Sequence, residues 1–205
     1  MLDYDSLAQM NMPRKTKLLS VIASNKVITD DHRQRLRFVE QLRNAFGDQI
    51  DVFGRGIREL PDKADAIWDY QYHVALENDH SPFYMSEKLL DGFLGWSFPF
   101  YSGGEYADRV LPSGSFARID MYDPEKSIAI IRRHISEYTF QSRMSHIAQA
   151  RIVVLDELNL FAVLCKYFDS NPPMKGTKKP LTLLPKKRAI RLTFERFVRA
   201  IAMAS

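Results

Sequence analysis

The chain has 205 residues, of which 45% are hydrophobic and 26% are charged, and its formal net charge is +4 at pH 7. This composition is that of an ordinary globular protein, and the length predicts one domain of about 150 residues with an appendage. A single cysteine, Cys165, excludes a disulfide within the chain, and no segment approaches the roughly 18 apolar residues that a membrane-spanning helix needs.

The first 17 residues lack the apolar core of a signal peptide. Together with the single cysteine, this indicates a reducing compartment, so the sequence predicts a cytoplasmic protein. Cys165 lies inside an apolar run from residue 158 to residue 168, and its side chain is therefore expected to be packed in the core.

From residue 17 onward, strand-like and helical patterns of apolar residues alternate along the chain. Residues 17–24 (KLLSVIAS) form a near-continuous apolar run, which is typical of a buried parallel strand. Residues 30–46 carry apolar side chains at helical spacing and precede Gly47, a helix stop signal. Residues 50–53 then indicate a short strand that Gly54 closes.

The alternation continues in the second half of the chain. A strand is expected at residues 72–77, followed by a helix that Ser86 caps and that runs from Glu87 to Gly95. The remaining predicted elements are strands at residues 97–101 and 116–121, a helix from residue 123 to about residue 138, and helix over much of residues 144–168. This order predicts an α/β fold with a Rossmann-like, doubly wound parallel sheet and right-handed crossovers.

Polar residues gather where the strand at residues 72–77 gives way to the next helix. Four of them, at positions 77–80 (ENDH), interrupt the apolar pattern. Open α/β folds bind their ligands at the carboxyl edge of the sheet, and the free N–H groups at the start of the helix at Glu87 favour a phosphate. The stretch from residue 72 to residue 103 is therefore the candidate site.

Three short motifs follow one another in this stretch: Glu77-Asn78 after a strand, YMSEK at residues 84–88, and FPFY at residues 98–101 with a glycine beyond. They resemble the signature of glycosyltransferase family 10, the α-1,3/α-1,4-fucosyltransferases, whose usual form is F-x-L-x-F-E-N-[ST], Y-[VIT]-T-E-K and P-[IV]-x-[WYL]-G. Supporting matches lie on both sides, at residues 24–25 (SN), 35–42 (RLRFVEQL), 51–54 (DVFG) and 112–116 (PSGSF). The resemblance covers roughly residues 17–138 and implies the C-terminal, nucleotide-sugar-binding half of that family's two-domain GT-B fold.

The resemblance also implies roles for individual residues. Arg35 and Lys88 resemble the pair of cations that hold the pyrophosphate of GDP-fucose. Glu87 resembles the carboxylate that bridges the ribose hydroxyls, and Tyr84 resembles the aromatic residue beside the nucleoside. Two further residues would line the same cleft, namely Asn78 and Ser86.

The chemistry of glycosyl transfer requires groups of these kinds. A departing nucleoside diphosphate gains negative charge, which fixed cations and a helix N-terminus stabilise. Each residue also has a structural interpretation that the sequence leaves open. The helix macrodipole alone favours Glu87 at a helix start, Lys88 is compatible with solvated surface, and Arg33 or Arg37 could serve in place of Arg35.

No catalytic residue is assigned within the chain. The resemblance implies a separate amino-terminal domain that binds the acceptor and supplies the base, and only about 16 residues precede the first predicted strand. That half is expected to be absent, so Glu77 or Asp79 would have to act as the base instead. The five histidines show no metal-ligand spacing, and no metal site is predicted.

The sequence thus predicts the donor-binding half of an inverting fucosyltransferase, of bacterial origin, that transfers fucose from GDP-fucose to a glycan acceptor. Two alternatives stay open: a non-catalytic or truncated nucleotide-binding module of the same fold, and a transferase for another nucleotide sugar. Some residues depart from the usual motifs, such as Asp79 after Asn78 and Met85 before Ser86. These departures weaken the prediction of fucose as the sugar more than the prediction of a bound nucleotide.

The charge of the chain is unevenly distributed. Residues 170–205 contain nine positive side chains against Glu195 alone, which leaves a net charge of about −4 on residues 1–169. Residues 186–203 form a basic amphipathic pattern that either binds an anionic membrane surface, at the inner face of the membrane, or packs on the body. No nucleic-acid motif is present, so no nucleic-acid partner is expected. The expected units are a lead-in at residues 1–16, the nucleotide-sugar-binding domain at 17–169, and a basic linker and helix at 170–205.

Overall fold

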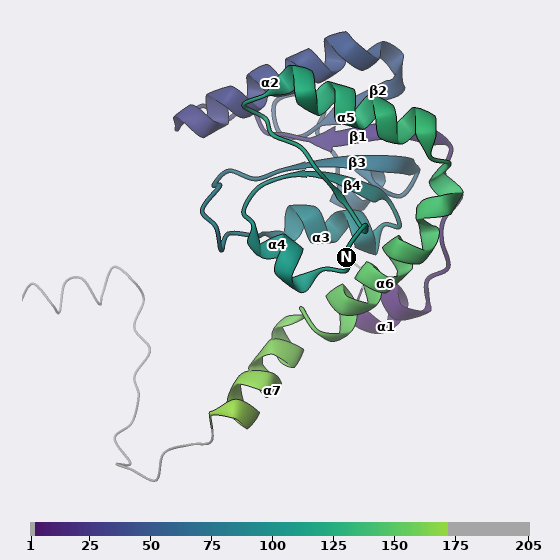
Figure 1. Ribbon diagram of the computed structural model, residues 1–205, viewed down its shortest axis with the longest axis vertical. Helices are drawn as coiled ribbons and strands as arrows, with labels where there is room; N and C mark the ends of the chain where they lie inside the picture. Colours follow the sequence, from purple (N-terminus) through teal and green to yellow (C-terminus); the bar gives the residue numbers. More distant parts are fainter. Residues whose placement is uncertain (1–2, 172–205) are drawn as a thin grey trace, which may run out of the picture. The chain divides into compact units, whose positions relative to one another are not determined.

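The computed structural model describes residues 3–171, and its central feature is a five-stranded parallel sheet (Figure 1). The strand order is β2-β1-β3-β4-β5, and each neighbouring pair runs parallel. The strands are β1 Lys17–Ile22, β2 Ile50–Phe53, β3 Tyr70–Leu76, β4 Phe98–Ser102 and β5 Ala117–Arg118. The predicted α/β fold with a Rossmann-like parallel sheet is confirmed.

The chain divides into two compact units, Met1–Tyr167 and Phe168–Ser205. The sheet belongs to the first unit. In the second unit only residues 168–171 are described, so the predicted linker and the amphipathic pattern at residues 186–203 lie outside the described residues. None of the described helices combines the length and the apolar character that crossing a bilayer demands.

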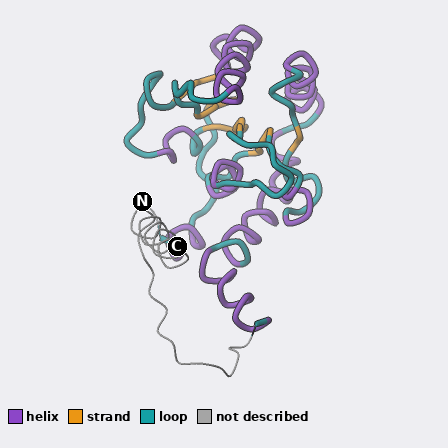
Figure 2. Tube along the Cα trace, turned by 90° about the vertical axis from the view of Figure 1, so that its left-hand side faces the viewer, coloured by secondary structure: helices purple, strands orange, loops and turns teal. Residues whose placement is uncertain are grey.

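Helices cover both faces of the sheet, and Figure 2 shows the strands between the two helical layers. On one face lie α2 Asp30–Phe46 and α5 Pro124–Glu137. Phe38 of α2 and Ile131 of α5 are fully buried there in the same cluster as Val74 of β3. The apolar stripe of a helix is buried in this way against alternate residues of a strand.

The opposite face of the sheet is covered by α3 Glu87–Leu94, α4 Tyr106–Val110 and α6 Met144–Asp156. Leu89 of α3 packs there in one cluster with Ala75 of β3. Val74 and Ala75 are neighbours in the chain and face opposite layers, because successive strand residues point to opposite sides of a sheet. Two helices complete the set, α1 Tyr4–Gln9 and α7 Leu160–Ser170.

The last predicted strand is much shorter than expected. The pattern at residues 116–121 predicts six residues of strand, but β5 has only Ala117 and Arg118. Beyond β5 the N–H of Ile119 still donates to the carbonyl of Tyr101 over 3.0 Å. The next two N–H groups bond to side chains, since Asp120 donates to Ser127 Oγ over 2.8 Å and Met121 donates to Ser102 Oγ over 3.2 Å. These side-chain bonds replace the ladder and lead the chain into α5.

The helical region at residues 144–168 is divided by Asn159. Its side-chain amide donates to the carbonyl of Leu155 over 2.6 Å, and its oxygen accepts the N–H of Ala162 over 2.9 Å. One side chain thus satisfies backbone groups at the end of α6 and at the start of α7. The expected burial of Cys165 is wrong, because this residue of α7 is exposed and no described residue of α7 is buried.

Candidate functional site

A buried arginine lies at the carboxyl edge of the sheet, between the ends of β1 and β3. Arg35 of α2 is only 4% exposed, and its guanidinium donates to Asn78 Oδ1 and to the carbonyl and hydroxyl oxygens of Ser24 at 3.2 and 3.3 Å. No carboxylate among the described residues forms an ion pair with it, and its buried Nε has no partner there. Burial lowers the pKa of Arg35. A buried cation compensated only by neutral groups is an unusual arrangement, and it favours an anionic ligand.

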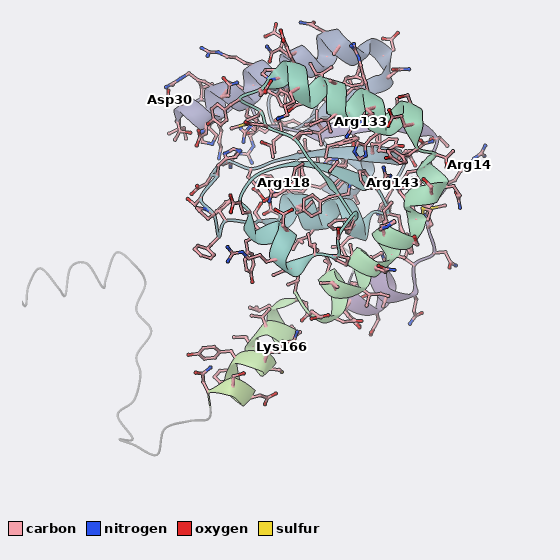
Figure 3. All side chains as sticks on the ribbon, in the orientation of Figure 1. Arg14, Asp30, Arg118, Arg133, Arg143 and Lys166 are labelled. Carbon is pink, nitrogen blue, oxygen red and sulfur yellow. The ribbon has the colours of Figure 1, made fainter. Side chains whose placement is uncertain are left out.

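The other arginines of this helix are placed differently. Arg33 pairs with Asp30 at the outer end of α2, where Figure 3 shows Asp30, and Arg37 is exposed. Of the three arginines that the sequence left open, Arg35 is the one that the structure brings to the edge of the sheet.

A second cation lies at the same edge and is held by a buried carboxylate. Glu77 follows β3 directly and is fully buried. Its oxygens accept the N–H of Ser86 over 2.8 Å, the hydroxyl of Ser86 over 2.7 and 2.9 Å, and the ammonium of Lys88 over 3.2 Å. Lys88 Nζ also donates to Ser86 Oγ over 2.9 Å, while its side chain is 25% exposed. Because Glu77 and Asn78 are consecutive residues, Lys88 and Arg35 lie around one strand end.

Glu87 at the first position of α3 pairs with a different lysine, Lys63. Its carboxylate accepts a hydrogen bond from Lys63 over 3.0 Å. Burial alone would raise the pKa of Glu87, but the bond from Lys63 and the charge of Lys88 bring that pKa below its ordinary value. The ionised side chain lines a cavity of about 460 Å³, which Trp68, Asp91 and Leu94 also border.

Tyr84 lies in the loop between β3 and α3 and is 36% exposed. Its carbonyl accepts the hydroxyl of Tyr101 over 3.4 Å, and its side chain does not line the cavity beside Glu87. The loop passes so close to Gly104 that a Cβ there would lie 2.5 Å from the carbonyl oxygen of Tyr84. A glycine at this position therefore permits the path of the loop.

A larger cavity of about 790 Å³ lies at the carboxyl ends of β4 and β5. His80, Asp120 and Tyr122 border it together with Arg118, which is labelled in Figure 3. Arg118 is fixed by Asp108 and by the carbonyls of Gly103 and Gly104. Four of its lining residues lie in the stretch 72–103 that the sequence predicts as the site, but none of the residues assigned to donor binding borders this cavity.

Two features of the site were missed by sequence reasoning. Lys63 precedes Glu87 by 24 residues and meets it only through the fold, so no local pattern identifies it. Glu77 was considered only as a base, and the structure instead shows its carboxylate enclosed by Ser86 and Lys88. Within residues 3–171, no three His, Cys, Asp or Glu side chains are grouped so that they could hold a metal ion.

Comparisons with known proteins bear on the family of the chain. A family model described as glycosyltransferase family 10 (fucosyltransferase) C-term matches residues 12–142. A human 4-galactosyl-N-acetylglucosaminide 3-alpha-L-fucosyltransferase is 28% identical over 125 residues, which are 58% of this chain and 33% of that protein. A 3-galactosyl-N-acetylglucosaminide 4-alpha-L-fucosyltransferase of Pan troglodytes is also 28% identical over 125 residues, covering 58% of this chain and 32% of its own length.

Solved structures share the fold. An alpha1,3-fucosyltransferase crystallised with GDP-fucose superposes with a TM-score of 0.52 at 17% identity, covering 69% of this chain and 43% of that one. An alpha1,3-fucosyltransferase with GDP gives a TM-score of 0.53 at 15% identity, covering 83% and 53%. The chain thus spans about a third of the length of the curated relatives it matches and about half of the solved ones.

Proposed function

Because the chain belongs to glycosyltransferase family 10, the fucosyltransferases, we propose that it binds GDP-fucose at the carboxyl edge of its sheet. In this proposal the chain carries the donor-binding half of an inverting transferase that moves fucose to a glycan acceptor. GDP-fucose is the donor because a structural neighbour was crystallised with it. The relatives named for transfer to galactosyl-N-acetylglucosaminides support a glycan as the acceptor class.

The observation that carries the proposal is the pair of cations around the end of β3. Arg35 is buried and has no anionic partner among residues 3–171, and Lys88 lies at the N-terminus of α3 with part of its side chain exposed. A diphosphate presents oxygens to two cations at once, and a guanidinium is suited to bidentate contact with phosphate. The free N–H groups at the start of α3 add partial positive charge toward the same point.

These groups also fit the chemistry of the leaving group. When the bond between the sugar and the β-phosphate breaks, the electron pair stays on the phosphate oxygen and the diphosphate gains charge. Cations that are already in place stabilise that charge without reorganisation. Arg35 and Lys88 would act in this way through their charge, and neither has to transfer a proton.

The nucleoside would lie on the side of Glu87. Its carboxylate can accept two hydrogen bonds from a ribose diol, as acidic residues do in other nucleotide sites. The present partner, Lys63, does not prevent this, because both side chains of the pair are more than half exposed and such pairs contribute little. The adjoining cavity of about 460 Å³ with Trp68 offers space and an aromatic surface for a nucleobase.

The base that deprotonates the acceptor is not assigned to this chain. Glu77 is buried, and its carboxylate accepts hydrogen bonds from Ser86 and Lys88. Asp79 is exposed, but Oδ1 accepts two bonds from Ser81, and these bonds lower the pKa of Asp79. The proposal therefore places the base on the acceptor-binding side, opposite the departing GDP.

Calorimetric titration with GDP and GDP-fucose tests the donor site, with UDP as the comparison ligand. We expect saturable binding of both guanine nucleotides, and at a hundredfold excess over Kd a stabilisation of about 2.7 kcal/mol. Lys88→Ala should weaken GDP binding and so reduce the thermal shift, whereas Lys166→Ala, an exposed lysine of α7 that Figure 3 labels, should keep it. Absence of GDP binding by the unaltered chain would refute the proposal.

Product analysis separates transfer from binding alone. Because the chain spans about a third of its curated relatives, it could bind the donor without transferring it. A chain that binds GDP but forms no fucosylated product with a broad acceptor panel is a binding module. A stronger thermal shift with a different nucleotide sugar would instead identify another donor.

We also propose that residues 186–203 contact an anionic membrane surface at its cytoplasmic face. The support is the sequence, in which residues 170–205 contain nine cations and one acidic residue. Sedimentation with vesicles containing phosphatidylserine should pull down the whole chain, and a variant ending at residue 171 should remain in solution. Equal sedimentation of both would overturn the membrane proposal.

A further inference from the structure

Resting on the proposed donor site, we infer that Glu77 is a positioning residue that holds the ammonium of Lys88 and the start of α3 in place for the diphosphate. Glu77 does not touch the ligand in this inference. It acts through Ser86 and Lys88, whose contacts with it join the end of β3 to the start of α3.

The burial of Glu77 makes these contacts necessary. Its side chain is fully buried, and its backbone N–H donates to the carbonyl of Ser102 on β4 over 2.9 Å. A buried carboxylate is unfavourable unless hydrogen bonds and an opposite charge compensate it. Ser86 supplies the hydrogen bonds and Lys88 supplies the charge. The three residues therefore form one unit, in which the loss of any member disturbs the others.

The first consequence concerns the helix start. Ser86 is the N-cap of α3, and its hydroxyl accepts the N–H of Lys88. Glu77 binds both the backbone N–H and the hydroxyl of Ser86. The N-cap is thereby tied to the strand end, which fixes where the first turn of α3 begins.

The second consequence concerns the lysine. An ammonium has three N–H groups, and two of those on Lys88 are directed to Glu77 and Ser86. Within residues 3–171 no acceptor holds the third, and the side chain remains 25% exposed. Glu77 thus removes the freedom of a long side chain, which otherwise opposes binding, and leaves one donor for a phosphate oxygen.

The charge of Glu77 could also act in the opposite direction, because a carboxylate near the phosphates repels them. Replacing Glu77 by glutamine distinguishes the two effects. If positioning dominates, Glu77→Gln weakens GDP binding, since the amide no longer pairs with the ammonium of Lys88. If repulsion dominates, the same change strengthens GDP binding.

The test is a double-mutant cycle on GDP affinity, measured by calorimetry with Glu77→Gln, Lys88→Ala and the double variant. We expect Glu77→Gln to weaken GDP binding about tenfold to thirtyfold in the unaltered chain and less than twofold in the Lys88→Ala background. Asp51→Asn is the matched control. Asp51 lies on the edge strand β2, where its carboxylate contacts Lys17, Arg58 and Tyr70, and its replacement should not change GDP affinity.

Each outcome of the cycle supports or overturns the positioning role of Glu77. Unchanged or stronger GDP binding by Glu77→Gln, or an effect of equal size in the Lys88→Ala background, overturns the positioning role while leaving GDP binding itself intact. Absence of GDP binding by the unaltered chain overturns the donor site and the inference together. If Glu77→Gln does not fold, Ser86→Ala replaces it, and the loss of this bridging hydroxyl should weaken GDP binding about threefold to fivefold. An unchanged affinity in that variant contradicts the inference.

Discussion

A half-buried lysine lies at each end of α3, but the two lysines have different surroundings. At the C-terminal end, Lys15 Nζ donates to the carbonyl of Gly95 and, over 2.8 Å, to that of Trp68. At the N-terminal end, Lys88 Nζ is held by Glu77 and Ser86. A cation is favourable at a helix C-terminus and unfavourable at an N-terminus, so Lys15 agrees with the macrodipole and Lys88 opposes it.

This difference separates a structural cation from a candidate binding cation. Lys15 also contacts the oxygens of Ile67 and Ser97, so all its donors have acceptors in the fold. Lys88 stands where its charge costs stability, and a buried carboxylate is needed to hold it there. Groups that oppose local stability are expected at functional sites, because their interactions are completed by a ligand.

The largest predicted effect follows from extending this comparison to Arg35. In Arg35→Met the apolar stem stays and the buried charge is removed, so the bonds to Asn78 and Ser24 are lost. We expect GDP affinity to fall about 100-fold, as for loss of a charge-assisted contact with phosphate. Calorimetry gives the affinity, and circular dichroism gives the melting temperature.

The same variant should change stability little or raise it, because the buried guanidinium has no anionic partner in the described part of the chain and its burial is therefore costly. A large fall in the melting temperature with unchanged GDP affinity would assign Arg35 to the structural class of Lys15. Arg37→Met, an exposed neighbour on α2, is the control and should leave both quantities unchanged.

Lys15→Met should show the reverse pattern. The change leaves the carbonyls of Ile67, Trp68 and Gly95 without their shared donor. We expect the free energy of unfolding to fall by about 2 kcal/mol, with GDP affinity unchanged. Urea denaturation measures the first quantity and calorimetry the second. A loss of GDP affinity in this variant would break the distinction between the two ends of α3.

A smaller effect is expected from Lys15 on the pH dependence of stability. Burial lowers the pKa of Lys15 from its ordinary 10.5 to about 7. Between these values the unfolded chain binds a proton that the folded chain does not, so stability should rise with pH, by at most about 1.4 kcal/mol per pH unit. The hydrogen bonds that the charged form makes to four oxygens oppose this rise and reduce its slope.

Melting curves at pH 7, 8 and 9 of the unaltered chain and of Lys15→Met measure this contribution as a difference. The gap in stability between the two proteins should change in favour of the unaltered chain as the pH rises. A gap that is constant, or that moves the other way, would show that the fold does not lower the pKa of Lys15.

Local patterns were sufficient to predict much of this architecture. The helix at residues 30–46 and the strand at 50–53 agree with α2 and β2 residue by residue, because capping residues and glycines define their ends. The predicted strand at 116–121 is too long, because Ser102 and Ser127 bind its backbone across the fold. Such side-chain bonds between distant elements leave no periodic trace in the sequence.

The candidate site was likewise predictable only in part. The order of its motifs led to Glu87, Lys88 and Arg35, and the structure brings the last two around the end of β3. The enclosure of Glu77 and the approach of Lys63 could not be predicted, since both depend on how the loops between strands fold. Sequence patterns identify which residue types are present near a site, whereas burial decides whether a carboxylate acts as a base or as an anchor.

The smallest predicted effect concerns Lys63, the third lysine near α3. It pairs with Glu87 over 3.0 Å and with Asp91 over 3.7 Å, but more than half of its side chain is exposed. Solvent screens such a pair, so Lys63→Ala should change the free energy of unfolding by less than about 0.5 kcal/mol and GDP affinity by less than twofold. If GDP affinity instead falls tenfold, Lys63 contacts the nucleotide directly, and the N-terminal end of α3 presents two ligand-binding lysines. If affinity rises, the pair with Glu87 competes with the ribose, because the carboxylate must then leave Lys63 before it can accept the diol.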